Sequence, residues 1–231
     1  MTTTFITGAN RSLGHETARR LLEAGQTVVL GARDPELGRA AADALGARFV
    51  RIDVTDDASV AAAVADVAAH EGTLDVLINN AGVNQPYKPA EELTAADAAG
   101  VFDVNVIGVV RVTQAFLPLL RTSANPVIVN VSSGMGSFAV THDPDRVEST
   151  FPAALYTASK SALNMLTTQY AKAWPDIKVN AADPGYTATD FNGHSGPQTV
   201  TEGTDAVVEL ATIGADGPTG QFRDRHGVVA W

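Results

Sequence analysis

A tyrosine and a lysine four residues apart, Tyr156 and Lys160, are the side chains best suited to acid/base chemistry in this sequence. The segment around them has a helical pattern, and an i, i+4 spacing places both side chains on one helix face. A nearby ammonium favours the phenolate, so we predict that Lys160 lowers the pKa of Tyr156 from its usual value of about 10. Such a tyrosine could exchange a proton near neutral pH. Taken alone, the spacing is more often that of a packed tyrosine beside a solvated lysine.

A glycine-rich turn, Gly8-Ala-Asn-Arg-Ser-Leu-Gly14, lies near the start of the chain. It follows a β-prone run, Thr3–Thr7, and precedes helical spacing from His15 to Ala24. Strand, glycine loop and helix is the context in which amide groups at a helix N-terminus bind a pyrophosphate. A glycine-rich turn is common by itself, so its position after the first strand of an alternating pattern is what favours nucleotide binding. Ser12 stands where glycine is usual in such loops.

The residues Leu30-Gly-Ala-Arg33, at the end of the second expected strand, bear on the choice of dinucleotide. A fold of this kind that prefers NAD places an acid here for the ribose 2′-OH, whereas this chain has Ala32 and Arg33. A guanidinium pairs well with a 2′-phosphate, and Arg11 in the glycine loop could add a second positive charge. We therefore expect NADP(H) as the cofactor. The alternative is that Arg33 is a solvated surface residue, while Asp34 is expected to cap the next helix rather than bind ribose.

Apolar runs alternate with helical patterns along the whole chain. Strands are expected at Thr3–Thr7, Val28–Leu30, Phe49–Ile52, Leu74–Ile78, Val127–Val131 and Ile177–Ala181, and around Val228. Helices are expected at His15–Ala24, after Asp34-Pro35, from the cap Asp56 to about His70, and from about Ala95 to Arg121 with a candidate break near Gly100. Two more are expected, one that holds Tyr156 and Lys160 and ends near Trp174-Pro175, and one near Thr201–Ala211. Unalternating strands between helices indicate a parallel sheet covered on both faces. We predict an α/β fold: one Rossmann-type doubly wound domain over residues 1–231, with a mostly parallel sheet of about seven strands and helices on both faces.

Composition narrows the class of partner. The 231 residues include 16 basic and 26 acidic side chains, for a net charge of −10, which argues against a nucleic-acid partner. There are no cysteines, and the five histidines are scattered, so no disulfide and no metal site are expected. The N-terminus lacks the pattern of a signal peptide, and no run reaches the roughly 18 continuous apolar residues of a membrane span. We expect a cytoplasmic protein without a membrane partner.

The motifs together resemble those of the classical short-chain dehydrogenase/reductase family over essentially the full chain. They are Thr7-Gly8-x-x-x-Ser12-x-Gly14, Asp53, Asn79-Asn80-Ala81-Gly82, Asn105, Ser133, Tyr156-x-x-x-Lys160 and Pro184-Gly185. Each motif is weak alone, but their order and spacing are specific. Extended-family epimerases are disfavoured because their glycine loop has a different spacing.

The resemblance implies four catalytic residues. Ser133 would steady the substrate carbonyl and Tyr156 would donate the proton. Lys160 would bind the nicotinamide ribose and tune Tyr156, while Asn105 would hold a water of a proton relay. Hydride arriving at a carbonyl carbon leaves negative charge on oxygen, which such donors stabilise. Taken singly, Ser133 could be a turn residue and Asn105 a residue that bonds backbone groups.

The resemblance also implies a cofactor site. Asp53 and Val54 would hold the adenine, Asn79 and Ala81 would line the cleft, and Thr189 would contact the nicotinamide carboxamide. The expected cofactor-binding residues are Gly8, Asn10, Arg11, Ser12, Leu13, Gly14, Arg33, Asp53, Val54, Asn79, Ala81, Gly82, Tyr156, Lys160, Pro184, Gly185, Thr187 and Thr189.

One departure from the family bears on assembly. Ser133 and Tyr156 lie 23 residues apart, which is more than is usual, and the extra segment resembles that of monomeric carbonyl reductases. We expect the polar stretch between Gly136 and Pro152 to form a loop or short helix over the site. A homodimer is expected because both long helices are apolar on more than one face, with a monomer as the alternative.

The substrate pocket is expected to draw its walls from three loops. The candidates are Val83, Met135, Phe138, Phe151, Tyr186, Phe191 and His194. They include no arginine or lysine, which disfavours a small carboxylate and favours a small-molecule ketone, aldehyde or quinone of hydrophobic character. The expected function is thus NADPH-dependent carbonyl reduction. The alternatives are reduction of a carrier-bound 3-oxoacyl thioester, or a sensor that binds NADP without turnover. The aromatic candidates could instead belong to the core.

Overall fold

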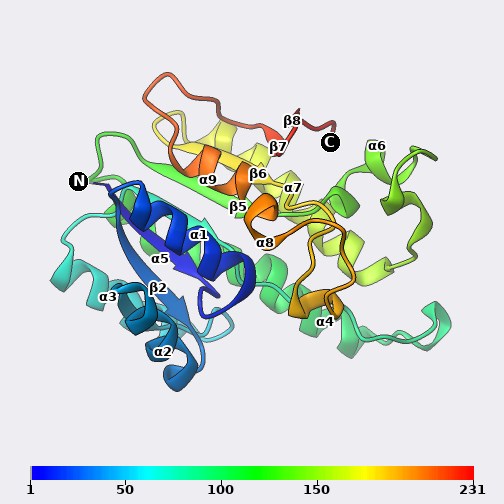
Figure 1. The fold of residues 1–231 in the computed structure, drawn as a ribbon, viewed down its shortest axis with the longest axis horizontal. Helices are drawn as coiled ribbons and strands as arrows, with labels where there is room; N and C mark the ends of the chain where they lie inside the picture. Colours follow the sequence, from blue (N-terminus) through cyan, green and yellow to red (C-terminus); the bar gives the residue numbers. More distant parts are fainter. Residues whose placement is uncertain (1) are drawn as a thin grey trace.

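The computed structural model describes residues 2–231, and its strands form one eight-stranded sheet in the order β3-β2-β1-β4-β5-β6-β7-β8 (Figure 1). Strands β1 to β7 are parallel, and β8 runs antiparallel to β7. The strands are β1 Thr3–Thr7, β2 Thr27–Ala32, β3 Arg48–Arg51, β4 Val76–Asn79, β5 Val127–Val131, β6 Lys178–Ala182, β7 Phe222–Asp224 and β8 Gly227–Val228. The predicted α/β class is confirmed. The strand expected around Val228 is β8, and the strand that was not expected is β7, Phe222–Asp224.

The helices follow local signals in the sequence. Asp34 caps α2 by accepting hydrogen bonds from the amides of Glu36 and Leu37, and Asp56 caps α3 in the same way. The α-helices are α1 Ser12–Glu23, α2 Pro35–Leu45, α3 Asp57–His70, α4 Ala95–Phe102, α5 Gly108–Leu120, α6 Phe138–Thr141, α7 Ala154–Ala173, α8 Val200–Gly203 and α9 Asp205–Ala211. The helix expected at Thr201–Ala211 is thus divided into α8 and α9.

Side chains alternate across the sheet and build two cores. Phe5 of β1 joins Val112 and Phe116 on one face, where α3, α5 and α7 pack. Its neighbour Ile6 points to the other face of the sheet, where α1, α2 and α9 pack. Leu21 of α1 belongs to this second core. Figure 1 shows α1 and α9 on the near side of the sheet and α5 and α7 behind it. The sheet is therefore covered on both faces, as its unalternating apolar strands predicted.

The long helix expected from Ala95 to Arg121, with a candidate break near Gly100, is irregular shortly after that residue. It contains a π-helical segment at Asp103–Ile107, between α4 and α5. This segment carries Asn105. Single-turn π segments inside α-helices are rare and occur frequently at functional sites. The irregularity expected near Gly100 is thus a π-helical segment rather than a break between two helices.

The combined helix Ala95–Leu120 is long and apolar enough to cross a membrane by length and composition alone, with a mean hydropathy of 1.4. Core helices of globular proteins meet the same criterion. Here Phe116 and Leu120 pack against the sheet, and Arg111 donates a hydrogen bond to the Val54 carbonyl oxygen. One face of the segment therefore packs against the sheet.

The polar stretch between Gly136 and Pro152 does not cover the site as predicted. It forms α6 and a 3-10 turn at Val147–Thr150, and none of its residues lines the main cleft. It packs instead against the C-terminal end of the chain. Ser137 donates a hydrogen bond to the Ala230 carbonyl oxygen (2.7 Å), and the Ala139 amide donates to that of Trp231 (3.3 Å).

Candidate active site

A cleft of about 350 Å³ opens at the carboxyl ends of the strands. The strand order reverses between β1 and β4, and ligands of doubly wound sheets bind at such a switch point. The residues that line the cleft are Gly8, Asn10, Arg11, Ser12, Leu13, Gly14, Arg33, Ile52, Asp53, Val54, Thr55, Asn80, Ala81, Gly82, Val83, Val104, Val131, Ser132, Ser133, Tyr156, Lys160, Pro184, Gly185, Thr187, Thr189, Asp190, Phe191 and Asn192. Every predicted cofactor residue except Asn79 is among them.

The glycine loop packs tightly against the segment that follows β4. A Cβ atom placed on Gly14 would lie 2.5 Å from Asn80 Nδ2, so only glycine fits there. Ser12 adopts a positive φ of 49°, a conformation that glycine reaches most easily, which accounts for the usual residue at this position. The loop leads directly into α1, whose N-terminal amides face the cleft. This arrangement suits a bound pyrophosphate.

The two asparagines after β4 have different places. Asn79 is buried below the cleft, and its Nδ2 donates to Thr113 Oγ1 (3.0 Å) and Asn130 Oδ1 (2.9 Å). The prediction that Asn79 lines the cleft was therefore wrong. Asn80 lines it instead, and its Nδ2 donates to the carbonyl oxygens of Thr7 (2.8 Å) and Gly8 (3.0 Å). Successive side chains of a strand point to opposite sides, which separates these neighbours.

At one end of the cleft, positive charge is available for a phosphate. Arg33 is exposed and, within residues 2–231, makes no hydrogen bond or ion pair. Asp34 is engaged as the cap of α2, with its Oδ1 accepting from the Glu36 amide (2.9 Å), so it does not face a ribose. Asp53 lies nearby, and its Oδ1 accepts hydrogen bonds from the amide and hydroxyl of Thr55. These residues fit a cofactor that carries a 2′-phosphate.

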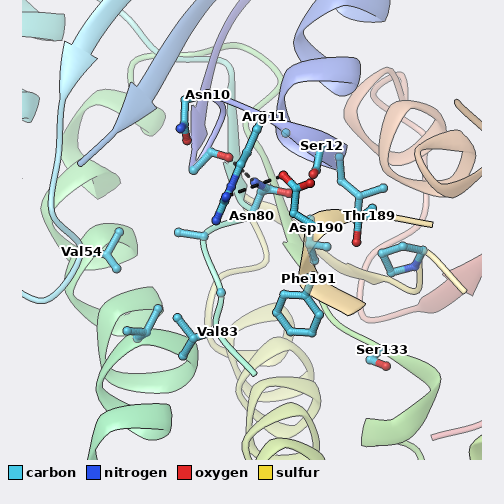
Figure 2. A pocket seen from close by; sticks show the side chains of 18 of the residues that line it. Asn10, Arg11, Ser12, Val54, Asn80, Val83, Ser133, Thr189, Asp190 and Phe191 are labelled. Atoms are coloured by element: carbon cyan, nitrogen blue, oxygen red, sulfur yellow. Dashed lines mark hydrogen bonds and ion pairs between the residues drawn. The ribbon is translucent and has the colours of Figure 1, made fainter. Parts of the chain in front are cut away.

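An ion pair spans the cleft between the glycine loop and the loop after β6. Arg11 Nη1 lies 3.6 Å from Asp190 Oδ2, and His194 Nε2 lies 2.9 Å from Asp190 Oδ1. Figure 2 shows Arg11 directed at Asp190 from across the cleft. All three side chains are largely exposed, which limits the strength of both pairs. No sequence signal singled out Asp190, because its partner lies in a distant segment.

Tyr156, Lys160 and Ser133 line the same cleft. Lys160 Nζ lies 5.7 Å from the centroid of the Tyr156 ring and donates to the Val131 carbonyl oxygen (2.8 Å). Burial raises the pKa of Tyr156 above its usual value, although the adjacent Ser133 hydroxyl opposes that rise. Burial also lowers the pKa of Lys160 to about 8. The prediction of a lowered tyrosine pKa was thus wrong, because desolvation raises the pKa of Tyr156 more than the Ser133 hydroxyl lowers it.

A buried carboxyl group, that of Asp183, lies beside Gly134. Asp183 is 3% exposed, and its Oδ1 accepts a hydrogen bond from the Gly185 amide (2.9 Å). Burial raises the pKa of Asp183 to about 6, and the charges of Glu148 and Asp224 act in the same direction. A Cβ placed on Gly134 would lie 2.8 Å from both Asp183 Oδ2 and Glu148 Oε1, so the extra segment reaches this spot through Glu148.

Asn105 does not line the cleft. Its side chain is buried and fully engaged: Nδ2 donates to the Val83 carbonyl oxygen (2.9 Å) and Ser159 Oγ (3.0 Å), and Oδ1 accepts from the Val83 amide (2.8 Å). Asn105 thus fixes the loop after β4 to α7. Its predicted role in holding a relay water stays a prediction.

Two of the seven predicted substrate-pocket residues line the cleft. These are Val83 and Phe191, and the Phe191 ring lies 5.5 Å from that of Tyr156. Phe191 and Ser133 lie together at the end of the cleft away from Asn10 (Figure 2).

The other five predicted pocket residues, Met135, Phe138, Phe151, Tyr186 and His194, do not line the cleft. Phe138 lies on α6 and is 70% exposed beside His142. Phe151 packs against Tyr186, with ring centroids 6.0 Å apart. His194 pairs with Asp190. Their assignment to the pocket from sequence was wrong in this structure.

The cleft also contains eight residues that the sequence analysis missed: Ile52, Thr55, Asn80, Val104, Val131, Ser132, Asp190 and Asn192. Most of them adjoin a predicted residue in the chain, so a wider window around each motif would have found them. Within residues 2–231 no cluster of three or more potential metal ligands occurs.

The sheet order, the glycine loop and the cleft at the switch point define a dinucleotide-binding α/β protein. Residues 2–199 match the family model of the short chain dehydrogenases. The chain therefore belongs to the short-chain dehydrogenase/reductase family of oxidoreductases.

Individual relatives are similar over nearly the whole chain. The short-chain dehydrogenase anuI of Penicillium roqueforti is 37% identical over 224 residues, covering 91% of this chain and 88% of the relative. The (-)-isopiperitenone reductase of Mentha piperita is 32% identical, covering 98% and 97%. The crystal structure of an NADPH-bound carbonyl reductase from chicken fatty liver is 30% identical, with a TM-score of 0.88, and covers 100% of this chain and 99% of that one.

Proposed function

We propose that this protein uses NADPH to reduce the carbonyl group of a hydrophobic ketone, aldehyde or quinone, with Tyr156 as the proton donor. The observation that carries the proposal is the joint presence of Tyr156, Ser133 and buried Lys160 in the lining of one cleft. NADPH, when bound, supplies the hydride. The Ser133 hydroxyl and the Tyr156 phenol then donate to the carbonyl oxygen, where negative charge develops. Lys160 adds a positive charge beside them.

The cofactor preference rests on the charges at the other end of the cleft. Arg33 is free to pair with a 2′-phosphate, whereas Asp34 is held as a helix cap. The chicken carbonyl reductase, which is similar to this chain, has NADPH bound. The pyrophosphate would lie on the glycine loop, and Lys160 and Thr189 would hold the nicotinamide riboside.

The substrate class follows from the walls beside Tyr156. Val83 is 37% exposed and Phe191 is 39% exposed, so both offer apolar surface to the cleft. The cations in the lining are Arg11, Arg33 and Lys160, and the first two lie at the cofactor end. An apolar carbonyl compound is therefore favoured over a small carboxylate.

A carrier-bound 3-oxoacyl substrate is less well supported. An acidic carrier would need a basic patch near the cleft. Two further bases outside the lining are already paired: Lys88 with Asp97 (2.7 Å) and Arg146 with Glu148 (3.1 Å). Both charges are neutralised within the chain.

We also propose a homodimer and a cytoplasmic location. Ile107 and Val110 near the start of α5 are 48% and 36% exposed, and Met165 of α7 is 60% exposed. These apolar side chains suit a contact between copies of the two long helices. Light scattering after size exclusion tests the assembly, since a mass of one chain, 24.0 kDa, contradicts the dimer.

The proposed activity is tested by following NADPH oxidation over a panel of ketones, aldehydes, quinones and 3-oxoacyl thioesters, with NADH in parallel. The proposal expects turnover of an apolar carbonyl compound, with NADPH preferred. Preference for the thioesters would favour the carrier-bound substrate. Tight NADPH binding without turnover of any compound would instead favour a sensor.

A further inference from the structure

The catalytic helix α7 begins without a capping residue of its own. Ala153 occupies the N-cap position and has no side chain that can accept a hydrogen bond. The first amides of a helix have no partner within it, and they are normally satisfied by a serine, threonine, aspartate or asparagine at this position. Tyr156 lies in this first turn. The position of its phenol therefore depends on whatever satisfies these amides.

A side chain from a distant loop supplies the missing cap. Gln85 Oε1 accepts hydrogen bonds from the amides of Leu155 (2.9 Å) and Tyr156 (3.2 Å), which lie 70 and 71 residues further along the chain. Gln85 belongs to the loop that follows β4 and is only partly exposed. The proline that follows it, Pro86, favours an extended backbone at Gln85.

The same loop is fixed at its other end. Asn105 holds Val83 by two hydrogen bonds, and its Nδ2 also donates to Ser159 Oγ (3.0 Å). Ser159 in turn donates to the carbonyl oxygen of Tyr156 (2.7 Å). The backbone of Tyr156 is thus held at its amide by Gln85 and at its carbonyl by Ser159.

We propose that Gln85 is a positioning residue for Tyr156: as a remote cap of α7, it sets the distance of the phenol from the reacting carbonyl and links that distance to the loop bearing Val83. The inference rests on the proposed function, in which Tyr156 is the proton donor. Proton transfer is sensitive to displacements of about 1 Å, which cost up to about 100-fold in rate. Loss of the cap should therefore affect the chemical step more than cofactor binding.

The test compares two substitutions of Gln85 that introduce side chains of similar length. Gln85→Met removes the acceptor, and we expect kcat to fall about 10-fold while the Kd for NADPH stays unchanged. Gln85→Glu keeps an acceptor at a helix N-terminus, where negative charge is favourable, and should restore kcat to within about 2-fold of the wild type. Equal losses in both variants would overturn the proposal.

A matched control separates positioning from lost stability. Gln26 also accepts a side-chain hydrogen bond, from Thr4 Oγ1 (2.5 Å), at the opposite end of the strands from the cleft. Gln26→Met should lower the free energy of unfolding to a similar degree without changing kcat. A fall in kcat as large as that of Gln85→Met would show that general destabilisation is the cause, and would overturn the proposal.

Amide hydrogen exchange gives a readout that needs no turnover. We expect the amides of Leu155 and Tyr156 to exchange about 10-fold faster in Gln85→Met than in the wild type, and to stay slow in Gln85→Glu. If these two amides exchange at the same rate in Gln85→Met as in the wild type, Gln85 does not cap α7 and the proposal is overturned. If the wild type reduces no carbonyl compound, the proposed function fails. The exchange rates of the two amides still show, without turnover, whether Gln85 caps α7.

Discussion

Arg11 and Asp190 face each other across the cofactor cleft, with Nη1 of one 3.6 Å from Oδ2 of the other. Arg11 comes from the glycine loop and Asp190 from the loop after β6, so the pair joins the two rims of the site. Arg11 is also one of the two arginines expected to pair with the 2′-phosphate of NADP(H). We therefore expect the cofactor and Asp190 to compete for the Arg11 guanidinium. Exposed pairs of this kind contribute roughly 0.2–1 kcal/mol.

The competition predicts that Asp190→Asn tightens NADPH binding by about 3-fold, because Arg11 no longer has to leave a carboxylate. Fluorescence titration of NADPH gives the Kd. In an Arg11→Ala background the same change should have no effect. Weaker binding by Asp190→Asn would contradict the competition.

Arg33 should decide between the two dinucleotides. Arg33→Ala is expected to raise the Kd for NADPH by about 10-fold to 100-fold, because a charge-assisted pair with the phosphate is lost, and to leave that for NADH nearly unchanged. Arg39→Ala is the matched control, since Arg39 is exposed on α2 and does not line the cleft. An equal effect on both cofactors would show that Arg33 does not recognise the phosphate.

The pH dependence of the free enzyme should report Lys160. Burial lowers the pKa of this lysine to about 8, and both of its proposed roles, in cofactor binding and in proton donation, need its positive charge. We therefore expect kcat/KM for NADPH to fall as the pH rises through about 8. Asp183→Asn removes a negative charge that raises the pKa of Lys160, so the fall in kcat/KM should occur at a lower pH in this variant. If the fall in kcat/KM above about pH 8 persists in Lys160→Met, it must come from the titration of another group.

Asp183 should make stability depend on pH in an unusual direction. Its pKa is raised from 3.8 to about 6, so between these values the folded protein holds a proton that the unfolded chain has released. The contribution of Asp183 to the free energy of unfolding therefore falls as pH rises through this window, by about 3 kcal/mol. Asp183→Asn abolishes this dependence.

Urea unfolding of the wild type and Asp183→Asn at several values between pH 4 and pH 8 measures the effect. The variant should gain stability relative to the wild type up to about pH 6, and the difference should then level off. Subtracting the free energy of unfolding of the wild type from that of the variant cancels the contributions of the other carboxylates. A difference that does not change with pH, or that grows towards acid, would contradict a raised pKa.

Much of the scaffold could be predicted because its signals are local. Strands Thr3–Thr7 and Val127–Val131 were expected at the bounds observed, since continuous β-branched runs mark buried parallel strands. Asp34 was expected as a cap and is one. The glycine loop and the Tyr156 helix were likewise placed correctly.

The features that were missed depend on distant parts of the chain. The π segment at Asp103–Ile107 places Asn105 against Val83 and Ser159, and no local pattern announces it. The pKa of Tyr156 follows from burial that only the folded chain creates. Gln85 lies in a loop and becomes informative only once its contact with α7 is seen.

The central claim, that Tyr156 donates the proton, is tested most directly by Tyr156→Phe. The phenyl ring keeps the packing against Phe191 and removes only the hydroxyl. We expect kcat for the best carbonyl substrate to fall about 1,000-fold, since a general acid contributes about 100-fold to 10,000-fold, while the Kd for NADPH stays within about 2-fold of the wild type. Substantial turnover in Tyr156→Phe, with NADPH binding intact, would contradict the account.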